Sequence, residues 1–163
     1  MHKYLKMATA YADSHEYHHN IDYYLAAVIV KGGKPISVGY NKHNTNAFVE
    51  HYADIARGNG RDFCLSTHAE MDAVLKIRGK IDLRGTKIFV ARRKKIGCVG
   101  MARPCPICQH VLYNYGIRKA YYTIDDNTFG VMRITNPATP YNNAAKNPND
   151  EIYRIMDDYE YQD

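Results

Sequence analysis

The sequence of 163 residues lacks an apolar run of 18 or more residues and contains only four cysteines. The missing run excludes an ordinary membrane-spanning helix. The N-terminus lacks the layout of a signal peptide, so we expect a cytoplasmic location, where the cysteines need not pair. No internal repeat is visible, and the length suits one well-filled core. We therefore expect a single domain over 1–163, with a core at about 20–135, a loop at 135–149 and an acidic C-terminal helix or tail at 150–163.

Charge is unevenly distributed along the chain. Residues 1–149 carry 21 Lys and Arg against 11 Asp and Glu, whereas residues 150–163 carry one against six. A basic body favours anionic partners, such as a substrate phosphate or a nucleic-acid backbone. A solvated basic surface that keeps the chain soluble explains the same pattern equally well.

Hydrophobic periodicity predicts the order of the elements. Helical spacing predicts an opening helix over 2–13, and two strands at 23–30 and 35–40 flank a Gly-Gly turn typical of a hairpin. The long segment 42–65 includes a short predicted helix near Phe48 and has the length of a functional lid. The later predicted elements are a helix over 67–79, a strand over 87–91, a helix from Pro104 to Tyr115, strands over 118–124 and 129–134, and a short helix over 150–158.

Two short segments carry candidate chemistry. Residues 67–70 read THAE, and residues 103–108 read RPCPIC. His68, Cys105 and Cys108 form a soft nitrogen and sulfur donor set that suits zinc, and a catalytic zinc site keeps three protein ligands and one water. Two thiolates cancel the metal charge, so the water is less acidified than at a three-histidine site and needs a nearby base. Glu70 is the candidate base.

Both segments are predicted at helix N-termini. With Thr67 as the N-cap, His68 and Glu70 fall in the first turn of one helix. Pro104 then opens a second helix whose cysteines, three residues apart, share one face. The partial positive charge of a helix N-terminus favours thiolate over thiol and carboxylate over acid. The predicted placement therefore suits a metal centre.

Each segment alone has a plainer interpretation. Thr67 and Glu70 are spaced as a capping box, and C-x-x-C also fits half a zinc ribbon or a redox pair. Cys64 leaves a second metal role open, and the histidines at 15, 18 and 19 fit a polar loop as well as a metal site. The basic run 92–95 fits a nucleic-acid contact or a solvated turn. The conjunction of the two segments is what favours a catalytic zinc.

The combined H-x-E and P-C-x-x-C pattern resembles that of the cytidine deaminase superfamily. The resemblance covers about residues 20–135. It implies an α/β fold of the cytidine deaminase-like type, with three α/β/α layers and a mixed sheet of about five strands. Because residues 124–128 are turn-like and a strand follows at once, we expect the last two strands to form an antiparallel hairpin.

The same resemblance implies an activity and its groups. The reaction is hydrolytic deamination of a cytosine ring to uracil with release of ammonia, with Zn²⁺ as cofactor and Glu70 moving the protons. By the family pattern, Asn41 contacts the sugar and the backbone amide of Ala69 donates to the base carbonyl. A homo-oligomer without membrane attachment is expected.

The substrate is less determined by the sequence. His68 as the first ligand resembles deoxycytidylate, tRNA adenosine and polynucleotide cytidine deaminases, whereas the expected hairpin resembles the nucleoside enzymes. Arg103 departs from the small or acidic residues common before the proline, which leaves the contact to the exocyclic amine open. We favour deoxycytidylate (dCMP), because the basic body suits a phosphate and no nucleic-acid module is added. Lys42, Arg57 and Arg61 are candidate phosphate contacts.

Three other functions stay open at this point. One is a base deaminase acting on RNA or single-stranded DNA, in which the basic run and tyrosines form a stacking track. Another is a cytidine nucleoside deaminase. The third is a structural zinc module without catalysis, which needs a fourth ligand from Cys64, Cys98 or a loop histidine.

Overall fold

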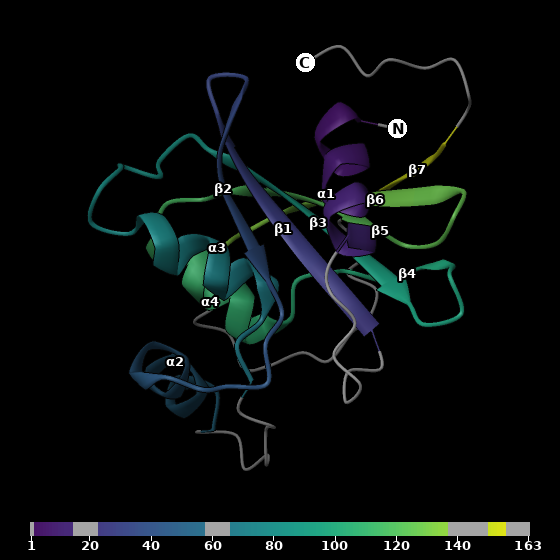
Figure 1. Ribbon diagram of the computed structural model, residues 1–163. Helices are drawn as coiled ribbons and strands as arrows, with labels where there is room; N and C mark the ends of the chain where they lie inside the picture. Colours follow the sequence, from purple (N-terminus) through teal and green to yellow (C-terminus); the bar gives the residue numbers. More distant parts are fainter. Residues whose placement is uncertain (1, 15–22, 58–65, 137–149, 156–163) are drawn as a thin grey trace.

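The computed structural model describes residues 2–14, 23–57, 66–136 and 150–155 (Figure 1). Within these ranges one mixed sheet has the strand order β2-β1-β3-β5-β6-β7, and the short β4 pairs with β3 outside this path. The strands are β1 (Tyr23–Lys31), β2 (Lys34–Tyr40), β3 (Lys87–Lys94), β4 (Val99–Gly100), β5 (Lys119–Thr123), β6 (Thr128–Arg133) and β7 (Glu151–Arg154). The helices are α1 (Lys3–Ser14), α2 (Ala47–Arg57), α3 (Ala69–Ile77) and α4 (Pro106–Asn114). None of the described helices is long and apolar enough to cross a membrane.

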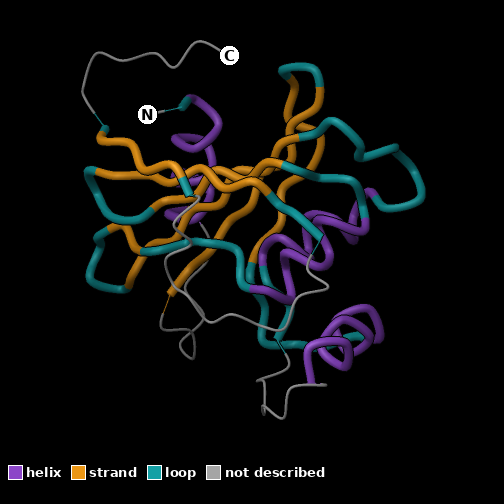
Figure 2. Tube along the Cα trace, turned by 180° about the vertical axis from the view of Figure 1, so that it is seen from behind, coloured by secondary structure: helices purple, strands orange, loops and turns teal. Residues whose placement is uncertain are grey.

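Helices cover both faces of the sheet, which confirms the expected three layers. Alternation along β1 sends Ala27 and Ile29 to one face and Val28 and Val30 to the other. The first face packs against α3 and α4, and the second packs against α1. Helix α2 lies beyond α4, on the side away from the sheet (Figures 1 and 2).

Two predicted hairpins are confirmed. The β1–β2 turn uses Gly32 and Gly33 at φ angles of 54° and 73°, where the absence of a Cβ removes the steric cost. Strands β5 and β6 pair antiparallel, with Tyr122 opposite Gly130. Among the pairings of the described strands, only β3 with β5 is parallel.

The expected sheet of about five strands is extended by β4 and β7. The predicted helix over 150–158 is wrong in its described part, because residues Glu151–Arg154 form β7 and pair antiparallel with β6. Residues 156–158 lie outside the described part. The backbone N–H and C=O groups on the outer edge of β6 would be unpaired without this segment, and they form hydrogen bonds with it. The Tyr153 ring also stacks on Phe129, with 5.2 Å between the ring centroids. Tertiary pairing thus overrides a weak helical pattern.

Close packing of β2 on α3 fixes the start of that helix. A Cβ added at Gly39 would lie 2.2 Å from both the Ala69 carbonyl oxygen and the Ala73 amide nitrogen. Only glycine therefore permits this approach. Two residues before Gly39 on β2, the Ser37 hydroxyl donates to the Ala73 carbonyl of α3 at 2.7 Å. The edge strand β2 and helix α3 are therefore in close contact.

Candidate metal centre

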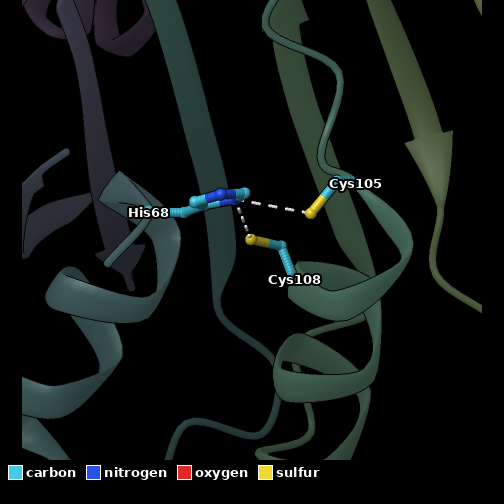
Figure 3. A group of neighbouring side chains, drawn as sticks. All are labelled: His68, Cys105 and Cys108. Carbon is cyan, nitrogen blue, oxygen red and sulfur yellow. Dashed lines mark hydrogen bonds between the residues drawn. The ribbon is translucent and has the colours of Figure 1, made fainter. Parts of the chain in front are cut away.

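The three predicted ligands meet where two helices begin. His68 is the N-cap of α3, Cys105 is the N-cap of α4, and Cys108 lies in the first turn of α4. The Nδ1 atom of His68 is 3.4 Å from the Sγ atom of each cysteine (Figure 3). All three ligand atoms lie within 4.8 Å of one another. These residues are positioned to hold a metal ion.

Thr67 does not cap α3 as predicted. Its hydroxyl donates to the Asn44 carbonyl at 2.7 Å, and the helix begins after His68, without a side-chain cap. The Thr67 amide donates to the carbonyls of Lys42 and Asn44. The Thr67 side chain therefore does not form the capping box with Glu70. The hydroxyl and the amide of Thr67 are both bonded to residues distant in sequence.

The second helix begins later than predicted. Pro106, not Pro104, occupies its first turn, and Cys105 precedes the helix in an extended conformation with φ −68° and ψ 162°. Proline suits the first helical position because its missing N–H has no partner there. The two cysteines therefore approach His68 from the N-cap and the first turn. The predicted end of this helix is confirmed, with Gly116 at φ 83° after Tyr115.

Glu70 is buried beside the ligands. The residue is 3% exposed, and its Oε2 atom has no hydrogen-bond partner among the described residues. Burial raises the pKa of this carboxyl, against the opposing effect of His68. A buried acceptor without a partner is costly unless water, an ion or a ligand satisfies it. The soft donor set and this oxygen together fit a zinc ion with a proton-transfer group beside it.

His68, Cys105 and Cys108 influence one another's protonation. A hydrogen bond with Cys105 raises the pKa of His68 to about 9, outweighing burial. Hydrogen bonds from Cys108 and His68 lower the pKa of the Cys105 thiol. Burial, together with the neighbouring Cys105, raises the pKa of the Cys108 thiol. Because zinc needs thiolates and neutral imidazole, its binding must displace protons from His68 and Cys108.

Within the described residues the metal group has three members, and Cys98 is outside it. Cys64 and the histidines at 15, 18 and 19, the other suggested ligands, lie outside the described residues. Three protein ligands are the number that catalytic zinc sites use.

Asn41 lies at the end of β2, where its side chain holds β1. Its Oδ1 accepts from the Leu25 amide at 2.7 Å, and its Nδ2 donates to the Tyr23 carbonyl at 3.2 Å. The next residue, Lys42, bridges to Thr67 beside the ligand His68. Ala69 is buried as the first residue of α3. Ala69 therefore directly follows His68 in the chain, and Asn41 lies next to the residue that pairs with Thr67.

Asp72 is a buried charge near the site that sequence reasoning missed. Its carboxylate is 2.6 Å from Lys42 Nζ and 2.8 Å from Lys76 Nζ, and it accepts from the Tyr40 amide at 3.0 Å. The spacing of Asp72 and Lys76 by four residues on a helix was the available signal. Lys42, a candidate phosphate contact, is thus already paired. The other two candidates, the side chain of residue 57 and residue 61, lie outside the described part.

The basic run 92–95 is mostly strand rather than turn, because β3 continues to Lys94. Arg93 forms ion pairs with Asp13 and Asp126. The Arg92 guanidinium lies over the Tyr23 ring, 3.9 Å from its centroid. Arg92 and Arg93 are therefore engaged within the protein.

Solved structures and one protein family are similar to this chain. Two solved structures of the dCMP deaminase from the cyanophage S-TIM5 are similar to this chain. The apo form is 20% identical with a TM-score of 0.47, and the similarity covers 74% of this chain and 79% of that chain. The complex with dCMP and dUMP is 21% identical with a TM-score of 0.47, and the similarity covers 73% of this chain and 76% of that chain. No curated protein sequence matches. Residues 1–124 match the family described as the cytidine and deoxycytidylate deaminase zinc-binding region. Since the match spans more than half of the chain and includes all three residues positioned to hold the metal, the chain belongs to this family.

Proposed function

We propose that the protein is a zinc-dependent hydrolase that deaminates a cytosine-containing nucleotide, with deoxycytidylate as the favoured substrate. The observation that carries this proposal is the convergence of His68, Cys105 and Cys108 beside the buried, unpartnered Oε2 of Glu70. A purely structural zinc site does not explain why a carboxylate oxygen is buried beside it without a partner among the described residues. A carboxylate that transfers protons during a reaction does explain it.

His68, Cys105 and Cys108 would hold the zinc, whose Lewis acidity lowers the pKa of water. Glu70 acts as general base and acid, because its carboxyl is buried beside these residues and its Oε2 has no hydrogen-bond partner among the described residues. It takes a proton from the water that attacks C4 and passes it to N3 of the ring. It then takes the remaining hydroxyl proton and delivers it to the leaving amine. Cytosine and water become uracil and ammonia.

The backbone at the start of α3 would orient the base. Ala69 is the first residue of α3, and the first amides of a helix have no partner within it. We assign the Ala69 amide to the base carbonyl. Asn41 would contact the sugar, since an amide oxygen has a second lone pair and its nitrogen a second hydrogen beyond those already used.

A free nucleotide is favoured over a polynucleotide. The exposed ring of Tyr23 under Arg92 is a stacking surface that suits a polynucleotide. However, acidic partners already neutralise Arg93, so the run offers less charge for a backbone than its sequence indicates. The excess of basic residues over 1–149 still supports a substrate phosphate. Oligomeric assembly and a cytoplasmic location are further parts of the proposal.

The test is ammonia release by the zinc-loaded protein across one substrate panel. The panel holds deoxycytidine, its mono- and triphosphates, the ribonucleotides, adenosine and a cytosine-containing single strand. Selective turnover of deoxycytidylate is expected. Turnover confined to the single strand would replace the nucleotide by a polynucleotide, and silence across the panel would favour structural zinc. Light scattering of the same sample measures its oligomeric state.

A further inference from the structure

A buried ion pair lies directly before the cysteine segment. Arg103 Nε donates to Asp150 Oδ2 at 2.6 Å, and its Nη2 donates to Oδ1 at 3.4 Å. The Tyr122 hydroxyl donates to the same Oδ2 at 2.8 Å. The side chains of Arg103 and Asp150 are only 12% and 5% exposed. Three segments far apart in sequence thus meet at one carboxylate.

The sheet fixes two of the three partners. The Tyr122 ring lies over Gly130 of β6 so closely that a Cβ there would be 2.2 Å from Tyr122 Cζ. Strand β7 pairs with β6, with Ile152 opposite Gly130. Asp150 precedes Ile152 by two residues and therefore enters next to the hydroxyl of Tyr122. Strand pairing and the Tyr122 hydroxyl thus place the carboxylate of Asp150 beside Arg103.

The third partner connects the carboxylate to the metal centre. Arg103 is two residues before Cys105, and Pro104 between them has a fixed φ angle. The Ala102 amide donates to the Thr123 carbonyl at 2.8 Å, and Gln109 Nε2 donates to the Pro104 carbonyl at 2.8 Å. The backbone before Cys105 is thus held from the sheet and from α4, and Arg103 is its side-chain anchor.

Asp150 lies outside the region matched by the family, which ends at residue 124. A buried guanidinium without a partner is strongly unfavourable. Asp150, directly before β7, supplies that partner for Arg103.

We propose that Asp150 is a positioning residue of the metal centre. Held by Tyr122 and the sheet, it fixes Arg103 and through it the placement of the Cys105 thiolate opposite His68. The inference rests on the proposed role of Cys105 as a zinc ligand, and not on which substrate is used. Loss of groups that hydrogen-bond directly to metal ligands typically weakens metal affinity about 10- to 100-fold. Because Asp150 acts through Arg103, we expect a loss at the lower end of this range.

The test compares Asp150→Asn with the parent in the full-length chain. We expect the zinc Kd, measured by competition with a chelator, to rise about 10-fold, the lower end of that range. We also expect the cobalt-substituted variant to show shifted thiolate-to-cobalt charge-transfer bands, because these report the placement of the sulfur atoms. Tyr122→Phe removes one of the hydrogen bonds to Asp150 and should give a smaller change in the same direction.

Asp82→Asn is the matched control. It breaks an exposed aspartate–arginine pair, in which Arg84 Nη2 lies 2.9 Å from Asp82 Oδ2, in the connection between α3 and β3. Zinc affinity and the cobalt spectrum of this variant should equal those of the parent. A comparable loss of affinity in Asp82→Asn would overturn the assignment to Asp150.

A folded Asp150→Asn protein with the parent's zinc affinity and cobalt spectrum would also overturn the proposal, leaving the ion pair as a clamp on the fold. If Asp150→Asn does not fold, the double variant Arg103→Met/Asp150→Leu decides, because replacing both charges by apolar groups is often neutral for stability. It should bind zinc more weakly, and unchanged affinity would refute the inference. A parent that binds no zinc would overturn both proposals, whereas zinc binding without deamination would remove only the proposed function.

Discussion

Gly39→Ala tests whether the close approach of β2 to α3 sets the metal centre. The new Cβ would lie 2.2 Å from Ala69 O and Ala73 N and 2.8 Å from Ala73 Cα. Ordinary contact needs about 3.5 Å. Strand and helix must therefore separate by about 1 Å, and the helix carries His68 at its N-cap.

The expected size follows from this displacement. Overpacking of a close-packed region costs about 1–3 kcal/mol. For a chain of this length that corresponds to a fall in Tm of roughly 2–12 °C. A displacement of about 1 Å at a catalytic centre costs on the order of 100-fold in rate. Zinc affinity should fall with it, because His68 moves away from the two cysteines.

Calorimetry, zinc competition and ammonia release measure these three effects. Gly85→Ala is the control: its Cβ meets nothing within 4 Å, but φ is 75°, which costs an alanine about 1–2 kcal/mol. Both variants should lose stability, and only Gly39→Ala should lose zinc affinity and activity. Full zinc affinity and turnover in folded Gly39→Ala would refute the reasoning.

Three further predictions concern charges. Glu70→Gln should keep zinc and fold but lose about 10²–10⁴-fold in turnover, measured by ammonia release, and substantial residual activity would contradict its role. Zinc binding at pH 7 should release about two protons, one from His68, whose pKa is about 9, and one from Cys108, whose pKa is raised, so zinc affinity should rise with pH. Calorimetry in buffers of different ionisation enthalpy counts the released protons. A release near zero would contradict this prediction. Burial raises the pKa of Asp72, but hydrogen bonds from its lysine partners outweigh this and lower it. Asp72→Asn should therefore lower the unfolding free energy by about 2 kcal/mol above pH 4. Urea titrations of parent and variant should show that the difference between their unfolding free energies vanishes as pH falls through the lowered pKa of Asp72.

The sequence predicted features that depend on neighbouring residues. The Gly32-Gly33 turn and the short connection between β5 and β6 specified hairpins, because tight turns have few compatible residue types. Likewise, H-x-E and P-C-x-x-C indicated a metal centre, since few residue types bind zinc and their spacing is narrow. The errors at Thr67 and Pro104 concern helix boundaries, where local preference is weak and long-range contacts decide.

The sequence by itself therefore determined the hairpins, the presence of helices α1 to α4 and the chemical identity of the candidate metal ligands. Only the tertiary structure decided that residues 151–154 form a strand, because the partner, β6, has unpaired edge groups that no local pattern reveals. The meeting of Asp150 with Arg103, 47 residues away in sequence, likewise follows from strand pairing. The buried state of the Glu70 carboxylate also depends on the assembled core. Contacts between distant segments set these features, whereas residue type and spacing set the others.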